Sequence, residues 1–276
     1  MPGHDPSRPL RPAYLRYPDE LSLSPHLPPP SLPAASLCKL FMKSAPLLLQ
    51  FILLTTPLAS LGSATFEAVT FALDSKRTFL PLTEASQQLG WSPRVNDKRG
   101  EISVNGRTLY TKNMRKFPDG SKLISLADLG KAGATVTARE DGSGYKVSAS
   151  GRHFQVVLAK KRAEINLKEQ RMRAWEGDRL VLDTNISSGK RGRTPSGSFT
   201  AGPYKARKHY SSRYNNAYMP YSVQVTGHIF IHGFKDVPKY PASHGCIRVP
   251  YLTNGNPARF FYEWINKGTP ITIVRQ

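Results

Sequence analysis

The sequence predicts a mostly β C-terminal domain that follows a small α/β module made of two similar halves. Two observations lead to this fold class. From residue 163 to the C-terminus, short alternating apolar runs are separated by Gly, Pro and Asn, which is typical of strands joined by tight turns. Between residues 65 and 155, a pattern of strand, short helix and hairpin occurs twice, with a spacing of about 43 residues.

Length and charge set broad limits on structure and partners. The 276 residues are enough for one or two domains with a sizeable core, and the formal net charge is +20. Such a basic surface suits nucleic acid, an anionic membrane or an acidic polymer such as a cell wall. Charge alone does not choose among these three classes of partner.

The N-terminal 64 residues have the composition of targeting segments. Residues 1–41 are rich in proline and poor in apolar pairs, so we expect a disordered tail or a misannotated upstream segment, with translation starting at Met42 instead of Met1. Residues 42–64 combine a basic head, an apolar body and small residues before Thr65, which predicts a cleaved signal peptide. The alternative is an uncleaved anchor, but the apolar stretch is shorter than the roughly 20 residues that a spanning helix needs.

The duplicated segment, residues 65–155, resembles the copper amine oxidase N-terminal-like domain. The first copy runs from Phe79-Leu80-Pro81-Leu82 to Asn105-Gly106, and the second from Leu123-Ile124-Ser125-Leu126 to Ser150-Gly151. The resemblance implies a stalk or wall-binding module, and a spacer without a ligand is the alternative. The segment contains no cluster of metal-ligating residues, because His153 is isolated, so we expect no metal there.

A histidine strand and a cysteine turn carry the chemistry of the C-terminal domain. An alternating apolar strand ends at His232-Gly233, and a loop leads from it to a turn that contains Cys246. Because Cys38 precedes Met42, the exported protein would carry Cys246 alone and could form no internal disulfide. A single thiol in an oxidising compartment is best explained by reactivity, although a buried inert cysteine is the alternative.

These motifs resemble those of the L,D-transpeptidase (YkuD-type) catalytic domain. The resemblance covers residues 163–276 and implies a YkuD-like β-sandwich with a short helix after the cysteine, which helical spacing places at residues 257–268. The matching segments are Ser187-Ser188-Gly189, Thr194-Pro195-Ser196-Gly197-Ser198-Phe199, Met219-Pro220-Tyr221, Ile231-His232-Gly233 and Ser243-His244-Gly245-Cys246-Ile247-Arg248.

The resemblance also implies the catalytic pair. Cys246 is the expected nucleophile, which forms a thioester, and His232, 14 positions earlier, is the base that takes the thiol proton. Many relatives have Ser or Thr just after the histidine-glycine step or use a backbone carbonyl to orient the histidine. Here Phe234 occupies that position, so we expect a backbone carbonyl.

Further site residues are expected around this pair. The backbone amides of Gly245 and Cys246 are candidate oxyanion donors, and His244 either lines the oxyanion site or acts as a scaffold. Ser243 is expected to brace the turn, and the segment 204–221 either covers the substrate or forms a solvated edge. The residues expected to contact substrate are Arg248, Ser243, Tyr221 and Gly233.

The predicted function is that of an exported cysteine acyltransferase of the periplasm or cell envelope. Its expected partners are peptidoglycan stem peptides and, through the basic surface, the anionic cell wall, with membrane contact only transiently through the signal peptide. The alternatives are an L,D-carboxypeptidase or amidase with the same nucleophile, a catalytically idle wall-binding protein, and a zinc site of His232, His244 and Cys246. Nucleic acid is not expected, because no nucleic-acid-binding motif is visible, and neither a metal nor a cofactor is required.

Overall fold

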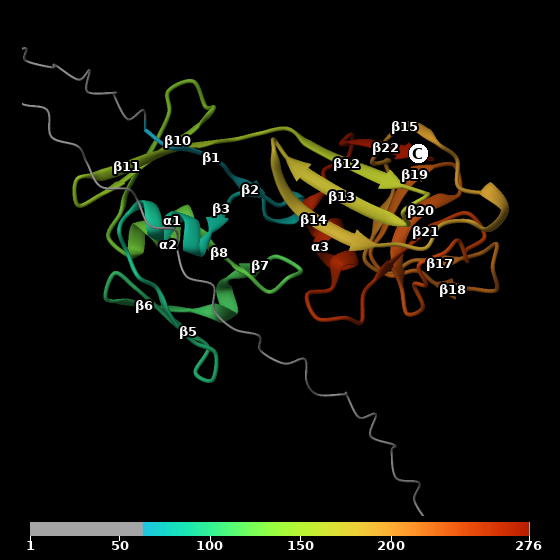
Figure 1. Ribbon diagram of the computed structural model, residues 1–276, viewed down its shortest axis with the longest axis horizontal. Helices are drawn as coiled ribbons and strands as arrows, with labels where there is room; N and C mark the ends of the chain where they lie inside the picture. Colours follow the sequence, from blue (N-terminus) through green and yellow to red (C-terminus); the bar gives the residue numbers. More distant parts are fainter. Residues whose placement is uncertain (1–62, 276) are drawn as a thin grey trace, which may run out of the picture. The chain divides into compact units, whose positions relative to one another are not determined.

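The computed structural model describes residues 63–275 (Figure 1). The proline-rich segment 1–41 and nearly all of the predicted signal peptide lie outside these residues. The described residues belong to one compact unit. No helix within them is long and apolar enough to cross a membrane.

The C-terminal part contains the two sheets of a β-sandwich. The first sheet has five strands in the order β14 (Arg179–Asn185), β13 (Arg171–Glu176), β12 (Lys161–Asn166), β22 (Pro270–Val274) and β15 (Gly197–Thr200). The second has four strands in the order β16 (Lys205–Ala206), β19 (Ser222–Thr226), β20 (Ile229–Phe234) and β21 (Ile247–Pro250). Smaller elements join them: η3 (Lys190–Gly192), β17 (Tyr210–Ser211) and β18 (Ala217–Tyr218).

Alternation of apolar and polar residues places one face of each sheet in a common core. In β12, Ala163 and Ile165 are buried while their neighbours remain partly exposed, as the period of two requires. Val223 of β19 and Ile247 of β21 belong to the same apolar cluster. The predicted mostly β fold is confirmed, and its second sheet carries the histidine strand.

Helix α3 (Pro257–Trp264) covers the core after the cysteine strand, but it is shorter than predicted. Asn256 begins it, because its side chain accepts a hydrogen bond from the Arg259 amide (2.9 Å). The prediction that the helix continues to residue 268 was wrong. Ile265 has an extended backbone (ψ 132°) and a fully buried side chain. Burial of this side chain in the core therefore ends the helix before Gly268, where the sequence had predicted its end.

The N-terminal part repeats one order of elements. One copy is β3 (Thr78–Pro81), α1 (Leu82–Gln88), β4 (Arg94–Asn96), β5 (Glu101–Val104) and β6 (Arg107–Tyr110). The other is β8 (Lys122–Ser125), α2 (Leu126–Lys131), β9 (Thr135–Ala138), β10 (Gly144–Ala149) and β11 (Arg152–Val157). The predicted repeat of strand, helix and hairpin is confirmed, and the two copies meet where β3 pairs with β8 antiparallel. The remaining elements are β1 (Thr65–Glu67), β2 (Val69–Thr70), η1 (Ala72–Asp74), η2 (Thr111–Asn113) and β7 (Arg115–Lys116).

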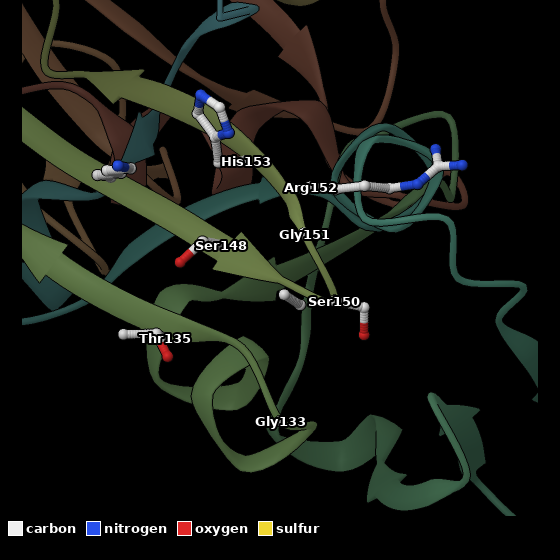
Figure 2. Close-up of a pocket in the computed structure, with 9 residues that line it drawn as sticks. Gly133, Thr135, Ser148, Ser150, Gly151, Arg152 and His153 are labelled. Carbon is white, nitrogen blue, oxygen red and sulfur yellow. The ribbon is translucent and has the colours of Figure 1, made fainter.

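A polar hollow of about 440 Å³ lies at one end of β9, β10 and β11 (Figure 2). The strand register aligns Thr135, Ser148 and His153 across the three strands. The hollow lacks aromatic side chains on which a sugar ring could stack, since its lining is Gly133, Thr135, Lys146, Ser148, Ala149, Ser150, Gly151, Arg152 and His153. The resemblance of this module to the copper amine oxidase N-terminal-like domain stays a prediction.

The N-terminal module contributes apolar side chains directly to the sandwich core. Phe71 packs edge-on against Phe260 of α3 with 5.5 Å between ring centroids. Val69, Phe79 and Leu123 belong to the same apolar cluster as the inward residues of the two sheets. The two parts therefore share one hydrophobic core.

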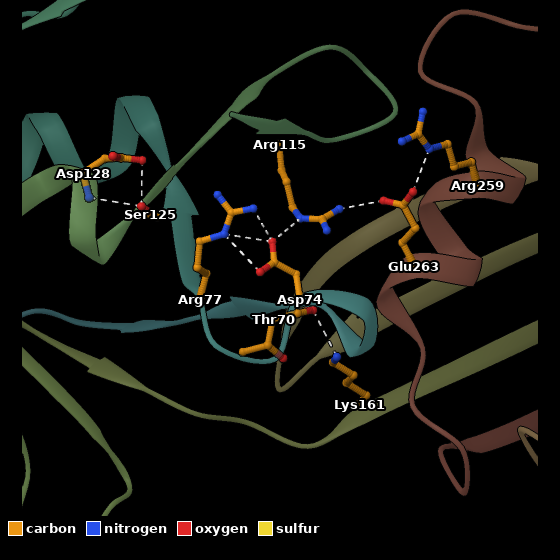
Figure 3. A network of polar contacts seen from close by, with 9 residues as sticks. All are labelled: Thr70, Asp74, Arg77, Arg115, Ser125, Asp128, Lys161, Arg259 and Glu263. Carbon is orange, nitrogen blue, oxygen red and sulfur yellow. Dashed lines mark hydrogen bonds and ion pairs between the residues drawn. The ribbon is translucent and has the colours of Figure 1, made fainter. Parts of the chain in front are cut away.

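Buried polar contacts reinforce this junction. Glu176, 1% exposed, accepts hydrogen bonds from the Thr70 amide and from the Trp264 indole nitrogen, each 3.0 Å long. Lys161 Nζ donates to the carbonyl oxygens of Thr70 (3.0 Å) and Trp264 (2.7 Å), and burial lowers the pKa of Lys161 to about 8. Figure 3 shows the neighbouring ion pair between Arg115 and Glu263, 2.6 Å long.

Candidate active site

Strand pairing brings the predicted histidine and cysteine segments together. β20 and β21 run parallel, with Ile231 opposite Ile247 and His232 opposite Arg248. Cys246 immediately precedes β21, so this register sets it beside Phe230, two residues before His232 along β20. The long-range pairing thus brings together two motifs that are separate in the sequence.

Hydrogen bonds fix the turn that presents the cysteine. The Ser243 hydroxyl accepts from the Gly245 amide (3.0 Å) and donates to the Cys246 carbonyl oxygen. From the neighbouring loop, Thr194 Oγ1 donates to the Gly245 carbonyl oxygen (2.6 Å). Gly245 has a φ of +145°, a conformation that favours glycine, and a Cβ atom there would also have to displace Ile229 Cδ1, 2.9 Å away.

This geometry corrects one predicted role. The Gly245 amide was expected to stabilise the oxyanion, but in the structure it donates to Ser243 Oγ. The short turn needs that bond to close. The role of the Cys246 amide as an oxyanion donor stays a prediction.

Cys246 is a buried neutral thiol in its resting state. Its side chain donates a hydrogen bond to the His228 carbonyl oxygen (3.4 Å), and the residue is 9% exposed. Burial raises the pKa of the thiol above its ordinary value, while the Phe230 amide and the charge of Arg248 offset part of that rise. Removal of the thiol proton therefore requires a base close by.

His232 has the geometry and charge state of such a base. Nδ1 donates to the Gly233 carbonyl oxygen (2.9 Å), which assigns the remaining lone pair of the neutral ring to Nε2. Burial lowers the pKa of His232 to about 4, so the ring is neutral at pH 7 and able to accept a proton. The predicted orienting backbone carbonyl is thereby confirmed, and it belongs to Gly233.

A cavity of about 230 Å³ joins the two side chains. Both Cys246 and His232 line it. The predicted residues Ser243, His244 and Arg248 line the same cavity, together with Tyr214, Ala217, Met219 and Phe234. A smaller hollow of about 100 Å³ approaches Cys246 from the side of His209 and Phe230. The thiol is thus accessible from two cavities.

The β-sandwich corresponds to a known protein family. Residues 160–273 match the family model described as YkuD, the L,D-transpeptidase catalytic domain. This segment is an L,D-transpeptidase catalytic domain. A search of curated proteins finds no match to the chain.

Solved structures with similarity to the chain include several L,D-transpeptidases. The structure from Stackebrandtia nassauensis is 22% identical with a TM-score of 0.37, over 42% of this chain and 55% of that chain. The one from Xylanimonas cellulosilytica is 27% identical with a TM-score of 0.37, over 42% of this chain and 61% of that chain. The one from Mycobacterium smegmatis is 16% identical with a TM-score of 0.38, over 77% of this chain and 94% of that chain. The chain thus spans little more than half of the first two structures.

Two side chains that line the cavity of the L,D-transpeptidase domain also contact aromatic rings. The exposed His244 ring stacks on Tyr214 with 4.8 Å between centroids and an interplanar angle of 22°. The Arg248 guanidinium lies over the Phe234 ring, 4.1 Å from its centroid. His244 thus lines the cavity, while the choice between its two predicted roles stays open, and Arg248 presents a positive charge to the cavity.

Two residues predicted to contact substrate, Tyr221 and Gly233, do not line either cavity beside Cys246. Tyr221 is absent from the linings of both cavities beside Cys246 and packs at 5.9 Å from the ring of Tyr262. Gly233 is buried in β20, where a Cβ atom would approach Tyr251 Cβ to 2.9 Å. Tyr221 thus packs against α3 and Gly233 supplies the carbonyl that orients His232, and their contact with substrate stays a prediction.

The cavity is also lined by residues that were not among the predicted site residues. Tyr214, Ala217 and Met219 come from the segment 204–221, whose length and aromatic content had suggested a cover over the substrate. The structure places this segment beside the cavity, which favours that alternative over a solvated edge. Phe234 lines the cavity because β20 continues one residue beyond the predicted strand end.

Alkylation kinetics should show whether the resting pair is neutral. Because the pKa of Cys246 is raised and that of His232 is about 4, the thiolate is a small minority near pH 7 and increases as the pH rises. We expect the rate of iodoacetamide alkylation to increase about tenfold per pH unit from pH 6 to 8. Mass spectrometry of the quenched protein measures this rate, and a plateau across that range would indicate a preformed thiolate–imidazolium pair instead.

Proposed function

We propose that the protein is an exported L,D-transpeptidase that transfers an acyl group from a peptidoglycan tetrapeptide stem to an amine through a thioester on Cys246. The observation that carries the proposal is the shared cavity of Cys246 and His232, with His232 oriented by the Gly233 carbonyl oxygen and kept neutral by burial. The match of residues 160–273 to the L,D-transpeptidase family model supports the substrate class. The signal-like segment 42–64 supports export to the periplasm or cell envelope.

The first half-reaction forms the thioester. His232 Nε2 takes the thiol proton while Cys246 Sγ bonds to the carbonyl carbon of the stem's L,D peptide bond. The negative charge that develops on the carbonyl oxygen is stabilised by the Cys246 amide. Collapse of the intermediate breaks the C–N bond, and the imidazolium gives its proton to the departing D-amino acid.

The second half-reaction releases the thiol. An amine attacks the thioester carbonyl, a new C–N bond forms, and the C–S bond breaks. His232 receives a proton from the attacking amine, and the thiolate regains a proton. The apolar side chains of Ala217, Met219 and Phe234 around the cavity disfavour attack by water.

Intact-protein mass spectrometry with a tetrapeptide stem tests the proposal. We expect a mass increase equal to the tripeptidyl group, with release of one D-amino acid, followed by transfer to an added amine. Release of free tripeptide at the same rate with and without the amine would identify a carboxypeptidase. Absence of any adduct on folded, reduced protein would contradict acyl transfer and favour a catalytically idle wall-binding protein.

A further inference from the structure

The positive charge of the catalytic domain is concentrated around its active site. Residues 186–251 contain ten Lys and Arg residues and only one acidic residue, Asp236. This stretch includes both catalytic side chains and every residue that lines the cavity between them. The excess charge therefore acts mainly where substrates arrive.

Six exposed cations lie in the chain segments that lead to or flank the residues of the site, and we refer to them as the basic rim: Lys190, Arg191, Arg193, Lys208, Arg213 and Lys235. The Lys190 amide donates to the Ser243 carbonyl oxygen (2.9 Å), which ties this loop to the cysteine turn. Arg213 lines the smaller hollow together with Cys246. Lys235 directly follows Phe234, which lines the larger cavity.

No carboxylate of the described residues forms an ion pair with the rim. The ion pairs found between residues 63 and 275 involve other cations, such as Arg115 with Glu263 and Arg179 with Glu84. The rim charges thus face solvent without an ion pair to any carboxylate between residues 63 and 275. Like charges gathered in this way favour an anionic partner, whose approach they accelerate and orient.

We propose that the basic rim selects an acidic polypeptide as the acyl acceptor, an inference that rests on the proposed function. The partner must carry both the negative charge that the rim attracts and the amine that the thioester consumes. An acid-rich polypeptide with a lysine or a free N-terminus provides both groups on one chain, whereas an anionic glycan without amines provides only the charge. The amine nitrogen bonds to the acyl carbon, the C–S bond breaks, and His232 receives the proton that the nitrogen loses.

The charge effect should depend on ionic strength. Screening acts over about 10 Å at 0.1 M salt and about 3 Å at 1 M salt, so exposed rim charges lose most of their influence as salt is added. A contribution from shape or apolar contact would persist. Salt dependence thus separates charge selection from other sources of preference.

Competition between two acceptors tests the inference on the full chain. Both peptides are N-acetylated and carry one lysine, flanked by Asp and Glu in one peptide and by Asn and Gln in the other. After acylation by a tetrapeptide stem at pH 7.5, mass spectrometry measures the ratio of the two transfer products. We expect the acidic peptide to be preferred about tenfold at low salt and less than about twofold at 0.5 M NaCl.

Matched variants assign the preference to the rim. Combining Lys190→Gln, Arg193→Gln, Lys208→Gln and Lys235→Gln should reduce the product ratio to about one. The same number of neutralised cations on the exposed β4–β6 sheet, Arg94→Gln, Lys98→Gln, Arg99→Gln and Arg107→Gln, should leave it unchanged. Because the readout is a ratio, any change in donor acylation cancels.

The outcomes distinguish this inference from the proposed function. A protein that forms no thioester refutes both. A protein that forms the thioester but transfers it equally to the two peptides at low salt refutes only the selection of an acidic acceptor. Equal transfer combined with inhibition of both reactions by dextran sulfate would assign the rim to an anionic glycan and would likewise overturn the inference.

Discussion

Cys246→Ala is expected to abolish formation of the thioester and to reduce acyl transfer at least 10⁴-fold. The methyl group of alanine offers neither a nucleophile nor a proton to exchange with His232, and covalent catalysis fails without the nucleophile. The substitution removes one sulfur atom from a residue that is 9% exposed, so the fold should persist. Intact mass after incubation with a tetrapeptide stem, and separately with a carbapenem, measures the adduct.

The second cysteine of the chain provides a matched control. Cys38→Ala removes the other thiol, which lies outside the described residues, and should leave the adduct at full occupancy. An adduct that persists in Cys246→Ala and disappears in Cys38→Ala would identify Cys38 as the nucleophile and refute the mechanism.

His232→Gln is expected to slow acylation about 10²- to 10⁴-fold, the usual contribution of a general base. Glutamine is polar and similar in size, and its amide can donate to the Gly233 carbonyl oxygen as Nδ1 does, but it offers no basic nitrogen to the thiol. Stopped reactions analysed by mass spectrometry give the acylation rate. A thermal unfolding curve that matches the unmodified protein would attribute the loss to chemistry rather than to folding.

The neighbouring histidine separates this effect from general changes in charge. His228 is exposed and contacts Cys246 through its carbonyl oxygen, so His228→Gln should change the acylation rate less than about threefold. Similar losses in the two variants would contradict the assignment of His232 as the base.

Local sequence patterns predicted the strands because alternation depends on neighbouring residues, whereas the catalytic pair was implied by the resemblance of the motifs. The alternation in β12 and β13, and the Gly177 turn after β13, with φ of +65°, are encoded within a few positions. The motif around Cys246 likewise identified four of the nine residues that line the cavity: Ser243, His244, Cys246 and Arg248. Each of these features is determined by residues that lie close together in the sequence.

Features that depend on distant contacts could not be predicted in this way. The helix was expected to run to Gly268, but burial of Ile265 ends it at Trp264. Tyr221 follows a matching motif, yet its ring packs towards Tyr262, which lies on α3. The Gly245 amide is occupied because Ser243 folds back over the turn. In the first two cases a tertiary contact decided the outcome, and in the third a hydrogen bond within the turn did.

The packing of Phe71 against Phe260 limits how this chain can be recombined with others. Placing residues 160–275 behind a different N-terminal partner would leave the sandwich without apolar side chains that complete its core. The Trp264 indole and Lys161 would keep Glu176 beside them, but Glu176 would lose the Thr70 amide and Lys161 would lose the Thr70 carbonyl. The catalytic domain therefore depends on the N-terminal module for part of its core, and the two are expected to be exchanged only together.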